Sequence, residues 1–117
     1  MSKVQKLLFV CYQNRARSVT AERILRGCRG YAVKSAGTAQ GARNHVNQSH
    51  IRWADQIFVM EELQARLLRE QFADLLGNKP LICLDIPDRY QCMHPALIDR
   101  LKKALSQHLD MPELKAA

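Results

Sequence analysis

The sequence predicts an α/β fold, a three-layer sandwich in which a four-stranded parallel sheet carries helices on both faces. Apolar runs of strand length alternate with segments whose apolar residues recur every three or four positions. The strand-like runs are almost continuously apolar, as in parallel strands that are buried on both faces. With 117 residues, the chain suffices for one domain. We therefore expect a single domain over residues 1–117, of which residues 110–117 form a frayed tail.

Four apolar runs predict the strands of this sheet. They cover residues 4–10, 31–35, 56–60 and 80–84. The second run is expected to stop at residues 36–38, which read Ala-Gly-Thr. In an open parallel sheet, ligands bind beyond the carboxyl ends of the strands. The turns after these four runs are therefore where a functional site is expected.

The first two predicted helices follow the first and second strands. Ser18 is a suitable N-cap for the first helix, which Gly27 can end. A loop of small and polar residues comes next. We then expect a short helix within residues 45–54, with Val46 and Trp53 facing inward.

Two longer helices are predicted in the second half of the chain. The third helix ends at Gly77, and its apolar stripe contains Leu63, Leu67, Leu68, Phe72, Leu75 and Leu76. Pro95 suits the first position of the last helix. In that helix a leucine recurs every four residues, at Leu97, Leu101, Leu105 and Leu109.

The charge of the chain is unevenly distributed. The 18 basic and 11 acidic residues give a net charge of +7. Residues 1–50 hold nine basic residues and one acid, whereas the remaining residues hold nine basic residues and ten acids. Such an excess near the N-terminus favours an anionic partner, which could be nucleic acid, a membrane surface or phosphate.

Several classes of protein are excluded by composition and spacing. The longest apolar run near the start, residues 7–12, is too short for a signal-peptide core or a membrane span. The four cysteines form no Cys-x-x-Cys pair, so neither a zinc site nor a thioredoxin motif is indicated. We expect a cytoplasmic monomer with free thiols that binds neither nucleic acid nor membranes.

The turn after the first strand carries the clearest chemical signal. Cys11 and Arg17 flank five residues between a strand and a helix. A loop that closes onto a helix N-terminus can point several backbone N–H groups at one oxyanion, and the Arg17 fork can hold two of its oxygens. The same donors favour a thiolate at Cys11, which is a nucleophile for phosphoryl transfer. A second Cys-x5-Arg match, at residues 83–89, is less suited to bind an anion. It contains two carboxylates, which repel a phosphate, and a proline, which lacks an N–H donor.

The chain resembles the low-molecular-weight protein tyrosine phosphatases. Residues 8–18, which read LFVCYQNRARS and are followed by Thr20-Ala21-Glu22, resemble the phosphate loop of that family. Residues 35–38, 54–61 and 86–90 resemble its second-strand loop, third strand and acid loop. The similarity runs in order from residue 4 to about residue 109. It implies hydrolysis of a phosphomonoester through a cysteinyl-phosphate intermediate, without a metal or another cofactor.

The resemblance assigns roles to the phosphate-loop residues. Cys11 is implied to be the nucleophile, and Arg17 to bind the equatorial phosphate oxygens. Asn14 and Ser35 are implied to brace the loop through hydrogen bonds, and Ser18 to ease departure of the thiolate.

The proton donor is expected in the acid loop after the fourth strand. The chemistry needs an acid that protonates the leaving oxygen and then activates water. The resemblance favours Asp88 because it stands near Tyr90, as the family acid stands near its aromatic residue. Asp85 stays open as the alternative.

Other residues are expected around the mouth of the pocket. Tyr12 and Tyr90 are implied to flank a substrate ring, so the expected partner is a phosphorylated protein or a small aryl phosphate. Arg15 and Arg43 are expected to attract anions to the same mouth.

Four departures from the family pattern bear on the site. Gln13 replaces the usual glycine, Ala16 replaces a second cysteine that can protect the nucleophile as a disulfide, and Arg89 replaces proline beside the acid. The segment over residues 39–54 is short, so we expect a stretch that helps brace the phosphate loop to be missing.

Three alternative functions remain. The first is a phospho-binding or regulatory module with weak catalysis, which the Gln13 change and the short segment motivate. The second is an arsenate reductase on the same fold, which would need Cys83 and Cys92 to relay a disulfide. The third is nucleic-acid binding, suggested only by the basic first half. Cys28 is interpreted as filler at a helix end.

Overall fold

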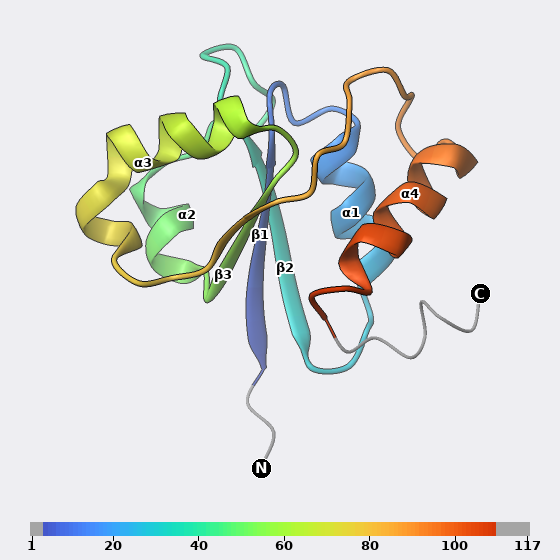
Figure 1. Cartoon of the computed structure of the whole chain (residues 1–117), viewed down its shortest axis with the longest axis horizontal. Coiled ribbons are helices and arrows are strands. Elements are labelled where there is room, and N and C mark those ends of the chain that lie inside the picture. The colour runs from blue at the N-terminus through green and yellow to red at the C-terminus, as the bar shows by residue number, and fades with distance from the viewer. Residues whose placement is uncertain (1–3, 110–117) are drawn as a thin grey trace.

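Four strands lie parallel in one sheet, in the order β2-β1-β3-β4 (Figure 1). The strands are β1 (Gln5–Cys11), β2 (Tyr31–Gly37), β3 (Gln56–Val59) and β4 (Leu81–Cys83). The structure is a computed structural model and describes residues 4–109. The tail expected over residues 110–117 lies outside the described residues.

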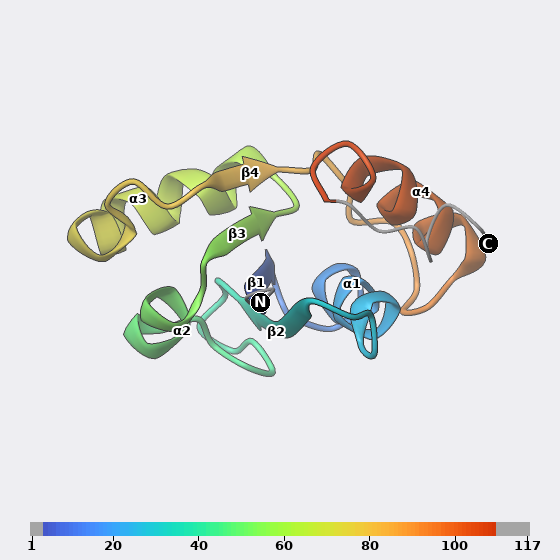
Figure 2. The ribbon, with the colours of Figure 1, turned by 90° about the horizontal axis from the view of Figure 1, so that it is seen from below.

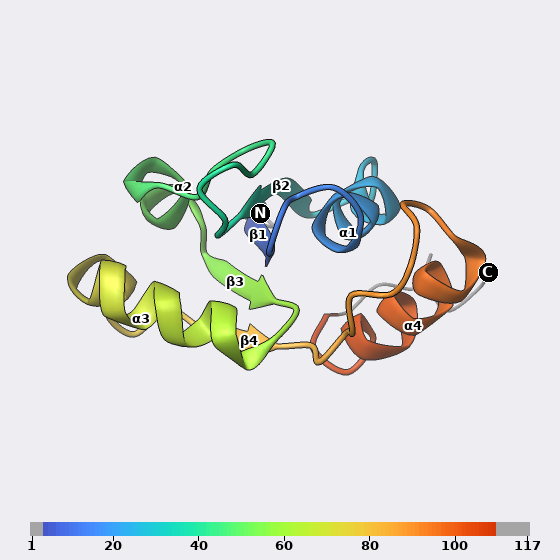
Figure 3. The same ribbon diagram turned by 90° about the horizontal axis from the view of Figure 1, so that it is seen from above.

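Helices cover both faces of the sheet, so the predicted three-layer sandwich is confirmed. On one face lie α1 (Arg17–Leu25) and α4 (Pro95–Leu105), and on the other lie α2 (Gln48–Trp53) and α3 (Glu62–Leu76). Figure 2 shows the two helix pairs from below and Figure 3 from above, with the strands between them. Each pair encloses its own apolar core.

Alternation along β1 builds the two cores. Leu7 and Phe9 face α1 and α4, whereas Leu8 and Val10 face α2 and α3, and all four are fully buried. The Phe9 ring stacks on Phe58 of β3 at 5.3 Å between centroids. A strand that is buried on both faces needs a continuous apolar run, which is why β1 was recognisable in the sequence.

The strand order places a switch point at the end of β1. The chain passes from β1 through α1 to β2 on one side, and it returns through α2 to β3 on the other. In such sheets the crevice between diverging connections is the usual ligand site. The register pairs Cys11 with Gly37 and Val10 with Val59. The carboxyl ends of β1, β2 and β3 therefore lie at the same edge of the sheet.

The ends of α1 and β2 differ from the prediction. The helix begins at Arg17 with Ala16 as its N-cap and without a side-chain cap, so Ser18 is not the N-cap. Ser18 is instead fully buried because its hydroxyl is drawn toward Cys11. The strand β2 does not stop at Ser35 but runs on to Gly37, since it pairs with β1 over its whole length.

Two positions around α2 also refine the prediction. The helix begins after Asn47, whose side-chain oxygen accepts from the backbone N–H of Ser49 at 2.9 Å. Val46 is buried but precedes the helix, and Trp53 is only half-buried.

The first turn of α3 departs from the predicted apolar stripe. Leu63 is 51% exposed, whereas the neighbouring Gln64 is almost fully buried. The Gln64 side-chain oxygen accepts from the backbone N–H groups of Met60 at 3.2 Å and Glu61 at 2.7 Å. These bonds satisfy donors at the helix start, which is why an amide occupies the buried position.

The last helix contains three of its four predicted leucines, and the fourth, Leu109, lies beyond the end of the helix. It begins at Pro95, and the imidazole of His94 accepts from the backbone N–H of Ala96 at 3.0 Å. The helix ends at Leu105, and the chain then turns so that Leu109 also reaches the core. The buried leucines are Leu97, Leu101, Leu105 and Leu109.

Replacing Leu101 with Ala should lower the free energy of unfolding by about 2–5 kcal/mol, because the change leaves a cavity among fully buried side chains. Urea denaturation measures this loss. Leu63→Ala is the matched control in an exposed helical position and should change stability by no more than about 0.5 kcal/mol. Equal losses at the two positions would contradict the assignment of the core.

Candidate active site

The loop that joins β1 to α1 curls around the Cys11 sulfur. Cys11 is the last residue of β1 and Arg17 is the first of α1, so the 11–17 loop crosses the switch point. The backbone N–H of Asn14 donates to Cys11 Sγ at 3.3 Å, and Ser18 Oγ lies 3.0 Å from the same sulfur. Both contacts are buried, and such donors stabilise negative charge on sulfur.

Asn14 gives the loop its shape. Its φ of 56° lies in the left-handed region, which asparagine tolerates better than most residues. Its side chain is buried, and Nδ2 donates to Ser18 Oγ at 2.8 Å. The hydrogen bond predicted for Asn14 is therefore present. Because Ser18 Oγ accepts this bond, its own proton can be donated to the Cys11 sulfur at 3.0 Å or to the Ala36 carbonyl oxygen at 3.5 Å.

The segment after β2 braces the 11–17 loop from behind. Three of its backbone N–H groups donate to three successive carbonyl oxygens of the loop. The bonds run from Thr38 to Cys11 at 3.0 Å, from Ala39 to Tyr12 at 2.9 Å and from Arg43 to Gln13 at 3.1 Å. Short as it is, the segment over residues 39–54 supplies two of these three bonds. Some bracing is therefore present, and the expected loss of a longer bracing stretch stays a prediction. Because these carbonyls are bonded, they do not turn toward the site.

A close approach at Gly37 makes this brace possible. A Cβ atom at Gly37 would lie 2.6 Å from the Tyr12 carbonyl oxygen and 2.9 Å from the Asn14 backbone nitrogen. Distances this short do not occur between real atoms of these kinds. Only glycine lets the second strand pack directly against the 11–17 loop.

Arg17 is buried, with 2% of its side chain exposed. Its Nη1 donates to Glu61 Oε1 at 2.8 Å and to the backbone oxygen of Ile86 at 2.9 Å. Its Nη2 lies 3.7 Å from Asp88 Oδ2. The guanidinium is thus held by the end of β3 and by the loop after β4, and its planar fork is oriented before any ligand binds.

Glu61 is a site residue that the sequence analysis missed. The hydrogen bond from Arg17 holds the pKa of the Glu61 carboxyl below its usual value, against the opposing effect of partial burial. Gln64 Nε2 also donates to the same carboxylate oxygen, at 3.1 Å. The available signal was an acid just after a predicted strand, but nothing in the sequence says which cation lies opposite.

A cavity of about 40 Å³ opens above the sulfur. It is lined by Cys11, Gln13, Arg15, Ala16, Arg17 and Asp88. The structure therefore brings the predicted nucleophile, the predicted arginine and the favoured acid to one small space. Such a volume suits one compact group rather than an extended ligand.

Asp88 and Asp85 lie in different surroundings. Asp88 lines the cavity, and 63% of its side chain is exposed, so it can exchange protons with solvent. Asp85 is not among the cavity residues, and its carbonyl oxygen accepts from Arg100 Nη2 at 3.2 Å. The geometry favours Asp88 as the acid.

The two tyrosines expected at the mouth do not line the small cavity. Tyr12 is 47% exposed, next to the nucleophile in the chain. Tyr90 lies beside the His94 ring, and the Arg89 guanidinium lies 5.5 Å from its ring centroid. Hydrogen bonds from Arg89 and Arg100 lower the pKa of Tyr90.

Two further predictions are corrected. Ser35 does not brace the 11–17 loop, because its hydroxyl donates to the Glu22 carboxylate of α1. Arg43 supplies only a backbone bond to the loop, and its side chain lines a neighbouring groove rather than the small cavity.

The four cysteines are all free thiols. Burial raises the pKa of the Cys83 thiol, which interacts with Glu62 and with the backbone of Asp85. Cys92 lies on the other side, where Thr20 Oγ1 donates to its sulfur at 3.8 Å. These separate environments do not favour the disulfide relay of an arsenate reductase.

Within residues 4–109, no group of three or more His, Cys, Asp or Glu side chains is placed to hold a metal ion. In the same part of the chain, no helix combines the length and the apolar character needed to cross a membrane.

Solved structures share the arrangement of strands and helices. The tyrosine phosphatase Wzb from Escherichia coli K30, solved with phosphate, has a TM-score of 0.73 and 20% identity, over 88% of this chain and 94% of that chain. Wzb from Vibrio vulnificus, solved with benzylphosphonate, has a TM-score of 0.71 and 22% identity, over 97% and 99% of the two chains. This chain has the low molecular weight phosphatase fold.

A third solved structure with this fold is an arginine phosphatase. YwlE from Geobacillus stearothermophilus has a TM-score of 0.63 and 21% identity, over 91% of this chain and 98% of that chain. No protein-family model matches the chain, and no curated protein sequence matches it significantly. At these identities the comparisons confirm the predicted fold.

Glu61→Gln should lower the free energy of unfolding at pH 7 and have less effect in acid. A carboxyl whose pKa is lower in the folded chain stabilises the fold above its unfolded pKa, and this stabilisation is lost as the pH falls through the folded value. Because Glu61 is half-exposed, we expect a difference of at most about 1 kcal/mol at pH 7.

Urea denaturation of both proteins at pH 7 and at about pH 3 measures this effect, since unperturbed Glu titrates near pH 4.3. Glu62→Gln, at the exposed neighbouring residue, is the control. A difference that is unchanged at low pH would mean that the Glu61 charge does not stabilise the fold.

Proposed function

We propose that this chain is a phosphomonoester hydrolase that acts on aryl phosphates, including phosphotyrosine in proteins. The observation that carries the proposal is the cavity in which the Cys11 sulfur, the oriented Arg17 guanidinium and the Asp88 carboxyl meet. A sulfur nucleophile, an oxyanion fork and a proton donor are the groups that phosphoryl transfer to cysteine needs. The fold shared with tyrosine phosphatases supports the proposal.

In the first step Cys11 Sγ attacks phosphorus in line with the leaving oxygen. The S–P bond forms as the P–O bond to the aryl group breaks, and Asp88 gives its proton to the departing oxygen. Arg17 and the backbone N–H groups of the 11–17 loop bind the three equatorial oxygens, where charge is spread in the transition state. The Ser18 hydroxyl, 3.0 Å from the sulfur, stabilises the thiolate before attack.

In the second step water releases the phosphoryl group from Cys11. Asp88, now a carboxylate, takes a proton from the attacking water, and the S–P bond breaks as the new P–O bond forms. Ser18 donates to the leaving sulfur. Inorganic phosphate leaves, and both Asp88 and the thiolate return to their starting states.

The proposed substrate class rests on Tyr12. Tyr12 is exposed and directly follows the nucleophile in the chain, although it does not line the small cavity. We infer that its ring contacts an aryl group that extends out of a cavity large enough only for the phosphate. Because YwlE is described as an arginine phosphatase, phosphoarginine is the competing substrate to test.

Cys11→Ser should lower kcat for p-nitrophenyl phosphate by at least about 10³-fold, because the alcohol is a far weaker nucleophile than the thiolate. Initial rates near pH 5–6, with reductant and chelator, measure this loss. Lys103→Gln, at an exposed position of α4, is the control and should keep wild-type rates. If wild type is no faster than Cys11→Ser, the chain is a phospho-binding module and the hydrolase proposal fails.

Asp88→Ala should lower kcat about 10²-fold, and the loss should be larger with phenyl phosphate than with p-nitrophenyl phosphate. Phenolate is more basic than p-nitrophenolate, so its departure depends more on a proton from the acid. Asp85→Ala is the matched control, since the same acid is removed from a position outside the cavity. A larger loss in Asp85→Ala would reverse the assignment of the acid.

A further inference from the structure

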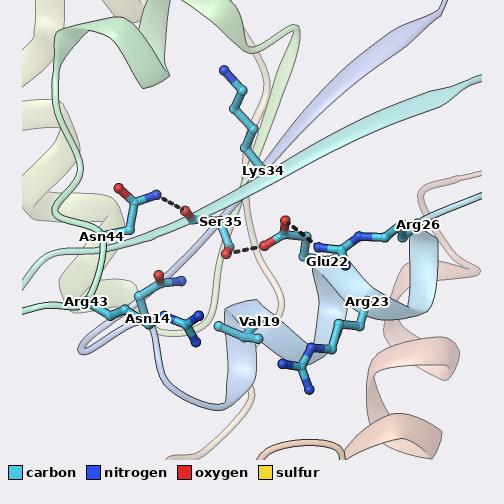
Figure 4. Close-up of a pocket in the computed structure, with 9 residues that line it drawn as sticks. All are labelled: Asn14, Val19, Glu22, Arg23, Arg26, Lys34, Ser35, Arg43 and Asn44. Carbon is cyan, nitrogen blue, oxygen red and sulfur yellow. Dashed lines mark hydrogen bonds and ion pairs between the residues drawn. The ribbon is translucent and has the colours of Figure 1, made fainter.

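A second and larger cavity lies on the α1 side of the 11–17 loop. It measures about 340 Å³ and lies between α1 on one side and β2 with the loop that follows it on the other (Figure 4). We call it the arginine groove, and its lining residues are Asn14, Val19, Glu22, Arg23, Arg26, Lys34, Ser35, Arg43 and Asn44. No part of the proposed mechanism uses it.

Three arginines give the groove its charge. Arg43 enters from the loop side, and Arg23 and Arg26 project from α1 opposite (Figure 4). Lys34 points away from them, and its ammonium lies 4.6 Å from the centroid of the Trp53 ring.

Glu22 is the single acid of the groove, and it is already partnered. One of its oxygens accepts from Ser35 Oγ, and the other lies 3.1 Å from Arg26 Nη2. Arg26 is therefore partly neutralised, whereas Arg23 and Arg43 have no carboxylate partner among the described residues. A carboxylate ligand would meet these two charges first.

The groove differs in kind from the small cavity at Cys11. A compact phosphate site surrounds one oxyanion with backbone N–H groups and a buried arginine. Here the three guanidinium groups are exposed and stand on opposite walls, so they match several separated charges better than one compact ion. An extended acidic peptide carries its charges in that way.

The groove and the proposed active site lie on either side of the 11–17 loop, and Asn14 stands between them. The Asn14 side chain lines the groove, while its backbone N–H donates to the nucleophile sulfur at 3.3 Å. Arg43 is also joined to the loop, because its backbone N–H donates to the Gln13 carbonyl. A peptide whose phosphorylated residue sits at Cys11 would pass over this loop into the groove.

We propose that the arginine groove binds acidic side chains that flank the phosphorylated residue of a protein substrate. This inference rests on the proposed phosphatase function and adds a sequence preference to it. No lining residue of the groove is aromatic, so it lacks the stacking surface by which proteins hold single-stranded nucleic acid.

The test compares two phosphotyrosine peptides of equal length, one with glutamates and one with glutamines beside the phosphotyrosine. The variant R23Q/R43Q removes the two charges that have no carboxylate partner, changes no residue that lines the small cavity and keeps the backbone N–H that donates to Gln13. The control R66Q/R69Q removes two exposed arginines from α3, on the other face of the sheet. The two variants therefore have the same net charge.

For wild type at low salt we expect kcat/KM to be about 5- to 20-fold higher for the acidic peptide than for the neutral peptide. This is the gain in binding that two exposed ion pairs can supply. R23Q/R43Q should lose this preference through KM, and R66Q/R69Q should keep it. Hydrolysis of p-nitrophenyl phosphate should be the same in all three proteins. The preference should also shrink at high salt.

Three results would overturn the inference. The first is equal kcat/KM for the two peptides in wild type, and the second is equal loss of preference in the two variants. The third comes from a competition experiment with two ligands, an oligo-dT strand and a glutamate-rich peptide without phosphate. If the oligo-dT strand displaces the acidic peptide at the lower concentration, the groove is assigned to nucleic acid.

Failure of the proposed function itself is recognised separately. If wild type hydrolyses neither the peptides nor p-nitrophenyl phosphate, the phosphatase proposal fails. Fluorescence anisotropy of the labelled acidic peptide, with wild type and R23Q/R43Q, then still measures the groove. Weaker binding to R23Q/R43Q than to R66Q/R69Q supports the groove, and equal binding overturns it.

Discussion

The guanidinium group of Arg17 is almost completely removed from water, and a buried charge is costly unless it is paired and hydrogen-bonded. Its partners come from two distant parts of the chain, namely Glu61 after β3 and the loop after β4, which supplies the Ile86 carbonyl and Asp88. Satisfying that one charge therefore draws together the first helix, the third strand end and the acid loop. The small cavity above Cys11 is where they meet.

The 11–17 loop depends on a second constraint, which is space. Gly37 lets β2 approach so closely that the following segment can bond three loop carbonyls in succession. With those carbonyls occupied, and with Asn14 in the left-handed region, the loop points the Asn14 N–H at the sulfur. The loop is thus held in a ligand-ready shape by backbone contacts, which Gln13 and Ala16 leave intact despite departing from the family pattern.

The structure divides the positive charge of the first fifty residues among different tasks. Arg17 is buried in the proposed catalytic site, Arg15 lines its mouth, and Lys34 lies on the Trp53 ring. The remaining charges on α1 and on the loop after β2 border the arginine groove. A net charge that suggested a large polyanion is better explained by one phosphate pocket with a basic groove beside it.

The sequence by itself determined the parallel sheet, the helices that cover it and the position of the 11–17 loop, because these depend on local patterns of apolar residues and on spacing along the chain. It could not assign the partners of Glu61 and Ser35, nor show that Leu63 is exposed and Gln64 buried. Only the tertiary structure decided these, since they depend on which strands become neighbours and on which charges and donors then need a partner.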